Sequence, residues 1–197
     1  MGARRKTARE IFGCHAIGTI RTGFRRATGT PIQPAFARGA RGKVIVDERY
    51  ARALDDVEGF DRVWLIYWMD RAGPFEPRVV PYRDTREHGL FATRAPCRPN
   101  PIGLSAVRLL RREGAILHVA DVDVLDQTPL LDIKPYVPEF DAHRVSRAGW
   151  LDARGKTRET ADARFHTPRR GRAGMRGRSG PCTAERRRSG RRSRTPS

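Results

Sequence analysis

The chain has 197 residues, with 40 Lys and Arg against 22 Asp and Glu, so its formal net charge is +18. No stretch of about eighteen apolar residues occurs, which argues against a membrane span. The three cysteines, Cys14, Cys97 and Cys182, are too few and too far apart for a disulfide framework or a paired-cysteine metal site. We therefore expect a reduced, cytoplasmic protein that holds no metal.

The positive charge is concentrated near the C-terminus. Residues 151–197 hold 15 Lys and Arg against 4 Asp and Glu, a net charge of +11, which leaves +7 for residues 1–150. Such an arginine-rich segment buries too little apolar surface to offset its ordering entropy. The composition predicts a basic N-terminal extension over residues 1–13, a folded domain over 14–152 and a disordered tail over 153–197. The tail serves either as an RNA-tracking arm or as a solvated extension.

The first half of the domain contains short apolar runs. Residues 16–20 and 43–46 are typical of strands, and Asp47 is a candidate N-cap for a short helix over residues 48–59. Residues 62–69, RVWLIYWM, are apolar at both alternating sets of positions. This pattern predicts a central strand that is buried on both faces.

The second half continues with strands. Residues 105–112 and 115–123 form two further apolar runs, joined across Glu113 and Gly114 by a sequence typical of a hairpin turn. Short strands with Pro- and Gly-rich connections favour a small antiparallel barrel or sandwich over a parallel α/β sheet. No GxGxxG element follows a strand, which disfavours a Rossmann-type dinucleotide fold. We therefore predict a mainly β domain.

Two proline-rich loops carry the densest set of polar side chains. Residues 94–105 read RAPCRPNPIGLS, and residues 125–136 read LDQTPLLDIKPY. Proline fixes its own φ and pushes the preceding residue out of the helical region, so Arg98 and Asn100 are held extended. Gly103 permits either a backbone conformation or a close approach that a Cβ would forbid. Stiff polar loops of this kind predict a prepared binding site.

These loops resemble the signature of the TsaA-like family, whose characterised members are TrmO-type tRNA methyltransferases. Upstream, residues 29–34 (GTPIQP) resemble the family's Pro-x-Gln element, and residues 89–94 (GLFATR) resemble the lead-in to its first loop. The four motifs occur in order between about His15 and Asp152, which makes their combination specific. The resemblance implies a small antiparallel β-barrel that binds S-adenosylmethionine without a Rossmann fold and works as a homodimer on tRNA.

The resemblance also implies a cofactor site. Its residues suit the ligand, because Asp126 and Thr128 offer a carboxylate and a hydroxyl to an ammonium group and ribose hydroxyls, and Arg94 offers a planar fork to a carboxylate. From the residues alone, Asp126 equally fits an Asx turn that shapes a corner of the barrel. Carried over position by position, the site falls on Pro31, Ile32, Gln33, Asp70, Arg71, Arg94, Leu104, Asp126, Gln127, Thr128 and Pro129.

Two positions depart from the family pattern. Asp70–Arg71 stands where the family usually has a histidine followed by a basic or amide residue, and Gln127 stands where the aspartate turn usually has glycine. If position 127 requires a positive φ, a glutamine there is strained. These departures bear on cofactor affinity and on the geometry of the loop.

The reaction implied by the resemblance is methyl transfer to N6 of threonylcarbamoyladenosine at tRNA position 37. Methyl transfer from a sulfonium depends mostly on in-line placement, but N6 must lose a proton. Asp132 and Tyr136 are candidate acceptors of that proton, and Lys134 is a candidate contact to a phosphate or a carboxylate. Arg98 and Asn100 are either substrate contacts or residues whose hydrogen bonds are satisfied within their own loop.

Two other functions stay open. A non-catalytic RNA-binding barrel would account for the high charge, and a methyltransferase of the same kind could act on a small molecule or another RNA. A simple RNA binder needs basic and aromatic surface rather than a proline-locked Asp/Thr turn, so the loops favour the enzyme. The histidines are scattered, and none stands at metal-ligand spacing from a cysteine or a carboxylate.

Overall fold

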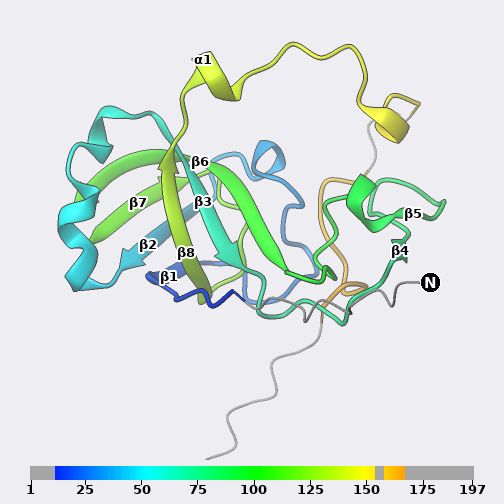
Figure 1. Cartoon of the computed structure of the whole chain (residues 1–197), viewed down its shortest axis with the longest axis horizontal. Coiled ribbons are helices and arrows are strands. Elements are labelled where there is room, and N and C mark those ends of the chain that lie inside the picture. Colours follow the sequence, from blue (N-terminus) through cyan, green and yellow to red (C-terminus); the bar gives the residue numbers. More distant parts are fainter. Residues whose placement is uncertain (1–11, 154–157, 167–197) are drawn as a thin grey trace, which may run out of the picture.

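The structure is a computed structural model that describes residues 12–153 and 158–166. The basic extension predicted over residues 1–13 lies almost wholly outside the described residues, as do residues 167–197 of the predicted tail. The described chain forms a barrel joined to a layer of loops, with a long connection that arches over both (Figure 1).

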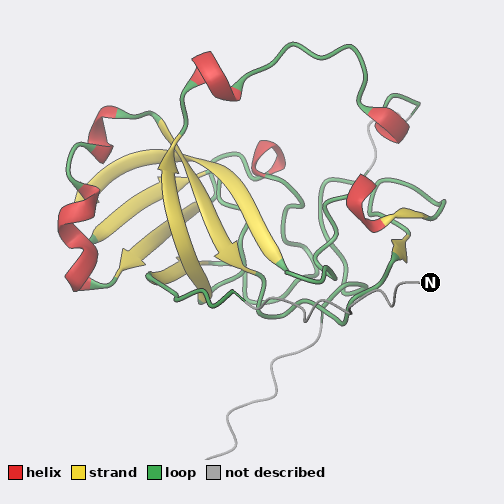
Figure 2. Cartoon of the chain, in the orientation of Figure 1, coloured by secondary structure: helices red, strands yellow, loops and turns green. Residues whose placement is uncertain are grey.

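The barrel, whose strands are yellow in Figure 2, is closed, antiparallel and six-stranded. Its strands, labelled in Figure 1, follow one another in the order β1-β2-β7-β6-β3-β8. The sequence-based prediction of a small antiparallel β-barrel is therefore confirmed, as is the hairpin between β6 and β7 around Glu113 and Gly114. The barrel strands are β1 (Gly18–Thr22), β2 (Arg41–Val46), β3 (Arg62–Trp68), β6 (Ile102–Glu113), β7 (Ile116–Ala120) and β8 (Thr128–Pro135).

Apolar side chains from alternate strand positions fill the barrel. In β3, Val63 and Leu65 are fully buried, whereas the side chains that alternate with them along the strand, such as Trp64 and Ile66, are only partly buried. The prediction that this strand is buried on both faces is wrong, because a closed barrel has a single interior and its outer face meets only loops and solvent. Trp64, on the outer face, packs against Tyr136 with 5.5 Å between ring centroids.

The segment between β2 and β3 is helical but not an α-helix. It forms two 3-10 helices, at Glu48–Leu54 and Val57–Gly59, and the side chain of Asp47 makes no capping hydrogen bond. The break falls at Asp56, whose φ of 66° lies in the left-handed region and ends the first helix. Further short helices occur at Pro34–Phe36, Leu90–Ala92 and Gly149–Leu151 and as α1 at Pro138–Asp141.

The loop layer has a small apolar core of its own. Val79, Leu90 and Cys97 are buried there together with Phe165, next to the two-stranded sheet of β4 (Arg78–Val79) and β5 (His88–Gly89). In Figure 1 the segment that carries Phe165 runs among these loops, far from the end of the barrel that holds the 3-10 helices.

Residues 158–166 thus differ from the disordered tail that the sequence predicts from residue 153. Ala161 exchanges backbone hydrogen bonds with Gly29 and Thr30, and His166 forms a β-bridge with Ala72. The arginine-rich average composition of the tail concealed Phe165, whose burial anchors this stretch.

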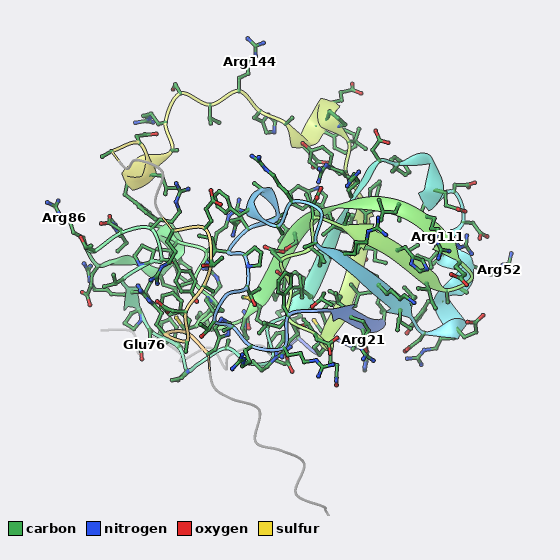
Figure 3. All side chains as sticks on the ribbon, turned by 180° about the vertical axis from the view of Figure 1, so that it is seen from behind. Arg21, Arg52, Glu76, Arg86, Arg111 and Arg144 are labelled. Carbon is green, nitrogen blue, oxygen red and sulfur yellow. The ribbon has the colours of Figure 1, made fainter. Side chains whose placement is uncertain are left out.

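Arginine side chains project from several parts of the surface. Arg21 and Arg111 extend from β1 and β6, Arg52 from the 3-10 helix at Glu48–Leu54, and Arg144 from the arching connection (Figure 3). Within residues 12–153 and 158–166, no helix is long and apolar enough to cross a membrane. The same residues contain no cluster of three His, Cys, Asp or Glu side chains that could hold a metal ion.

Candidate functional site

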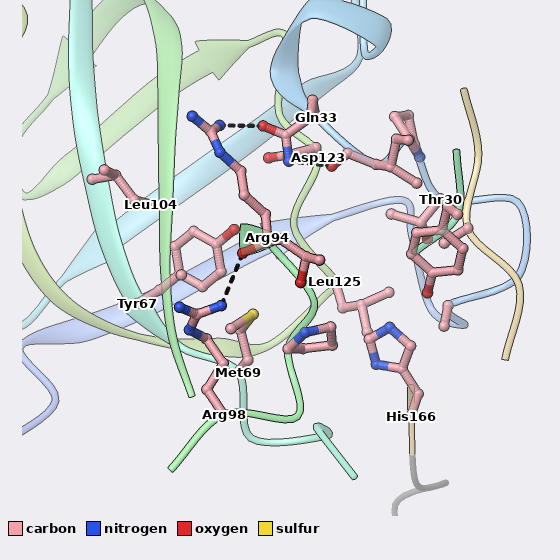
Figure 4. A pocket seen from close by; sticks show the side chains of 18 of the residues that line it. Thr30, Gln33, Tyr67, Met69, Arg94, Arg98, Leu104, Asp123, Leu125 and His166 are labelled. Carbon is pink, nitrogen blue, oxygen red and sulfur yellow. Dashed lines mark hydrogen bonds between the residues drawn. The ribbon is translucent and has the colours of Figure 1, made fainter. Parts of the chain in front are cut away.

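A pocket of about 320 Å³ opens between the loop layer and the end of the barrel where β3 stops and β6 and β8 begin (Figure 4). This volume falls at the lower end of the range typical of small-molecule sites. Residues far apart in sequence meet here, because the pocket is lined by the loop between β1 and β2, the loop before β6 and the loop before β8. The walls include Thr30, Tyr67, Arg94, Asp123 and His166.

One wall carries the first group of predicted cofactor residues: Pro31, Ile32, Gln33, Arg94 and Leu104 all line the pocket. The guanidinium of Arg94 donates a hydrogen bond to Oε1 of Gln33, which ties the two loops together. An isolated antiparallel β-bridge between Pro31 and Thr160 holds this wall against residues 158–166.

The second group of predicted residues, Asp70, Arg71 and residues 126–129, forms a separate cluster. Arg71 donates to the carbonyl oxygen of Asp126 at 2.6 Å and to the Thr128 hydroxyl at 3.3 Å. It also lies 3.5 Å from the carboxylate of Asp70. Arg71, a basic residue as the family pattern has at this position, therefore holds the aspartate turn in place.

The Asp126 carboxylate is engaged by the chain itself. It accepts hydrogen bonds from the Arg21 side chain at 3.0 Å and the Thr22 backbone N–H at 3.1 Å. Partial burial opposes ionisation, but these two donors outweigh it and lower the pKa of Asp126 below its usual value. Gln127 has a φ of 64°, so the strain expected for glutamine at this position is present.

The two groups meet across a common floor. A smaller cavity of about 80 Å³ shares five lining residues with the main pocket: Tyr67, Met69, Asp123, Leu125 and His166. That smaller cavity is lined in addition by Asp70, Arg71 and Thr128. The structure thus brings most of the predicted cofactor residues to two cavities that share lining residues.

Asp123 is a site residue that the sequence did not single out. Its carboxylate accepts a hydrogen bond from Ser105 at 2.6 Å, and the Ser105 hydroxyl lies 3.0 Å from that of Tyr67. Burial raises the pKa of Asp123 to about 6, although the Ser105 hydrogen bond and the charge of Arg94 work against the rise. A carboxyl poised near neutral pH at the floor of a pocket is a candidate proton acceptor.

The sequence held one signal for Asp123. It is an acidic residue in a run of apolar residues, VDVL, three positions before the aspartate turn. An acid at such a position is costly to bury unless hydrogen bonds or a charged partner compensate it, so its presence marks a candidate site residue. The sequence did not distinguish Tyr67 as a site residue, because a tyrosine is ordinary in an apolar strand that is rich in aromatic residues.

The predicted catalytic and substrate residues are placed elsewhere. Asp132 and Lys134 pair with each other at 2.8 Å on β8 and do not line the main pocket. Tyr136 packs against Trp64 and borders a different hollow, which Arg94 and Leu104 also line. The structure therefore does not bring Asp132 and Tyr136 to the floor on which Asp123 lies.

Arg98 and Asn100 have different surroundings. The Arg98 guanidinium lines the pocket but donates to the carbonyl oxygens of Thr93 at 3.1 Å and of Leu90 and Ala95 at 3.5 Å each. This is the satisfied loop role that the sequence left open for it. Asn100 is exposed and does not line the pocket.

A closed antiparallel barrel with a polar pocket at one end, walled by proline-rich loops, defines a small-ligand-binding barrel. The family model of the tRNA-methyltransferase O N-terminal domain matches residues 19–142. The chain therefore belongs to the TrmO-type family of S-adenosylmethionine-dependent methyltransferases.

Relatives and solved structures agree with this family. The chain is 48% identical over 151 residues to a probable S-adenosyl-L-methionine-binding protein of Pyrococcus abyssi, covering 76% of this chain and 82% of the relative. It is 34% identical to the tRNA (adenine(37)-N6)-methyltransferase of Escherichia coli, covering 64% of this chain and 58% of that enzyme. A crystal structure of TrmO from Pseudomonas aeruginosa superposes with a TM-score of 0.61 at 37% identity, covering 72% of this chain and 63% of that chain. The chain thus spans less than two thirds of the length of these two methyltransferases.

Proposed function

We propose that the protein transfers a methyl group from S-adenosylmethionine to N6 of threonylcarbamoyladenosine at position 37 of a tRNA, in the cytoplasm and as a homodimer. One observation carries the proposal: the two groups of family residues converge on a single floor that holds a carboxyl with a pKa near neutrality. The names of relatives from Escherichia coli and mouse support the choice of acceptor.

The residues present fit S-adenosylmethionine. Arg94 supplies a guanidinium for its carboxylate, and the cluster of Arg71, Asp126 and Thr128 supplies rigid backbone and hydroxyl groups beside the smaller cavity. The buried Nδ1 of His166 has no hydrogen-bond partner among the described residues, which leaves one polar atom at the cavity for a ligand to satisfy. When bound, S-adenosylmethionine supplies an electrophilic methyl group and keeps the electron pair of the broken S–CH₃ bond.

Asp123 then has a defined role. As the N6–CH₃ bond forms, the nitrogen becomes cationic and must lose a proton, which the Asp123 carboxylate accepts. Ser105 and Tyr67 hold that carboxylate in one orientation through the hydrogen bonds described above. Positioning by the rigid loops accounts for the rest of the rate enhancement.

Two measurements test the function. Calorimetry on the purified protein should show saturable binding of S-adenosylmethionine, and nucleoside mass spectrometry of tRNA from a deletion strain should show loss of the N6-methylated nucleoside and its return on complementation. Binding without any change in tRNA would move the acceptor to a small molecule or another RNA. No binding at millimolar concentration would leave only the RNA-binding barrel.

A further inference from the structure

A second cavity adjoins the first. It has a volume of about 450 Å³, and it shares Ile32, Gln33, Tyr82, Thr93 and Arg94 with the main pocket. No family residue carried over from the sequence lies in it apart from those shared ones. We call it the aromatic groove, and its rings belong to Phe36, Tyr82, Phe91, Trp150 and Phe165.

The groove combines one exposed aromatic ring and several partly buried ones with positive charge. Phe91 is 77% exposed, although a side chain of its size is normally buried. The guanidinium of Arg98 lies 5.3 Å from the Phe91 ring centroid, and that of Arg83 lies 5.4 Å from the Phe36 ring centroid. Arg83 and Arg94 line the groove, and among the described residues no acidic side chain does.

The walls of the groove are rigid. Trp150 donates its indole N–H to the carbonyl oxygen of Ala92 at 2.8 Å, and its ring stacks on His88 with centroids 4.7 Å apart. Arg98, whose guanidinium lies over the Phe91 ring, is fixed by the three loop carbonyls that it contacts. The loop that presents Phe91 is therefore prepared before any ligand arrives, which reduces the entropy cost of binding.

We propose that the aromatic groove binds an unpaired nucleobase of the substrate RNA, the neighbour of the nucleotide that is methylated. The inference rests on the proposed function and adds a subsite to it. An unstacked base recovers its stacking energy on aromatic rings and arginine planes, and guanidinium groups meet the phosphates on either side. The walls shared with the main pocket, above all Arg94, place such a base next to the methyl acceptor.

The test uses the full chain and an RNA stem-loop that carries the acceptor adenosine in its loop. Phe91→Ala should weaken binding of this stem-loop about tenfold or more, because loss of one base–aromatic stack has an effect of this size. Phe91→Trp should retain the affinity, whereas Phe91→Leu, which keeps apolar area without a ring, should not. Binding of S-adenosylmethionine measured by calorimetry should be the same in all four proteins.

Phe140→Ala is the matched control, since Phe140 is also an exposed phenylalanine, at 63%, but lies on α1 outside the groove. Equal stem-loop affinity for the wild type and Phe91→Ala overturns the subsite. A lower oligomeric mass of Phe91→Ala with unchanged RNA affinity also overturns it, because the groove is then an interface between copies of the chain. RNA binding that depends on Phe91, without methyl transfer by the wild type, supports the subsite and overturns the proposed function instead.

Discussion

The ring of Tyr67 lies against Gly103, its partner across β3 and β6, so closely that a Cβ at residue 103 would stand 2.1 Å from Cε2 of the ring. Of the two reasons for a glycine that the sequence left open at residue 103, the structure has the close approach. It sets the ring so that the hydroxyl reaches Ser105, which in turn reaches Asp123. The absence of a Cβ at Gly103 thus allows Tyr67, Ser105 and Asp123 to adopt their positions at the floor of the pocket.

Substituting Gly103→Ala should therefore damage both stability and the site. The added methyl group must displace the Tyr67 ring, and overpacking of this kind costs about 1–3 kcal/mol. Urea denaturation should show the loss of stability, and calorimetry should show weaker binding of S-adenosylmethionine. Gly89→Ala is the control, because a Cβ at Gly89 meets nothing within 4 Å and its φ is not positive. Equal effects of the two substitutions would contradict the role given to Gly103.

Asp123 should leave a pH-dependent signature on stability. Burial raises its pKa in the folded protein to about 6, above the ordinary value of 3.8. The neutral form is thus favoured by folding, so the stabilisation is fully present below about pH 4 and is lost as the pH rises through 6. Asp123→Asn should remove this dependence and unfold at higher urea than the wild type at pH 7–8. Asp132→Asn, on the outer surface of β8, serves as the control.

The same residue should shape the rate of methyl transfer. If the Asp123 carboxylate accepts the N6 proton, single-turnover rates of the wild type rise as the pH increases through about 6 and then level off. Asp123→Asn should lower the rate constant of the bound complex and lose this rising limb, with little change in the affinity for S-adenosylmethionine. A variant that keeps the limb would assign the titration to another group.

Much of the fold could be predicted from the sequence because it depends on local patterns. The apolar runs in 62–69 and 105–112, and the Glu113–Gly114 turn, act over a few residues each. What the pattern could not supply was the closure of the barrel, in which β8 pairs with both β1 and β3. Closure leaves a single interior face, and the prediction of a two-sided β3 failed for this reason.

The site was predictable only where a loop sequence specifies its own shape. The prolines pointed to the loops that hold Arg94 and the aspartate turn, and the family resemblance assigned these residues and Pro31–Gln33 to a cofactor site. Asp123 was missed, because its orientation in the site depends on a hydrogen bond from Ser105, which lies in another part of the chain. The contribution of His166 was missed as well, since nothing near it in the sequence distinguishes it from the tail.

Asp126 should act through the shape of its turn. Its carboxylate holds Arg21 and the Thr22 backbone N–H, so Asp126→Ala leaves that N–H without its acceptor. We expect binding of S-adenosylmethionine to weaken by about 1–3 kcal/mol, as for loss of a charged hydrogen-bonding partner. Asp126→Asn keeps one acceptor oxygen and should retain part of the affinity. Full affinity of Asp126→Ala in calorimetry would remove the turn from the site.

Two truncations separate the roles of the C-terminal residues. Ending the chain after residue 166 removes 11 Arg and 1 Glu, a net charge of +10, but keeps Phe165 and His166 in place. Each phosphate neutralised by an arginine releases counterions, so this truncation should flatten the salt dependence of tRNA binding and leave S-adenosylmethionine binding unchanged. The rate at saturating tRNA should change little, because uniform binding does not lower the barrier of the bound complex.

Ending the chain after residue 157 should do more. It also removes Phe165, 7% exposed in the small core of the loop layer, and His166 at the floor of the pocket. Burial of a phenylalanine side chain contributes about 1.5–3 kcal/mol, so urea denaturation should show a loss of that order. The pocket loses one wall, so the affinity for S-adenosylmethionine should change as well. If the two truncated proteins are equally stable and bind S-adenosylmethionine equally well, residues 158–166 form no part of the site.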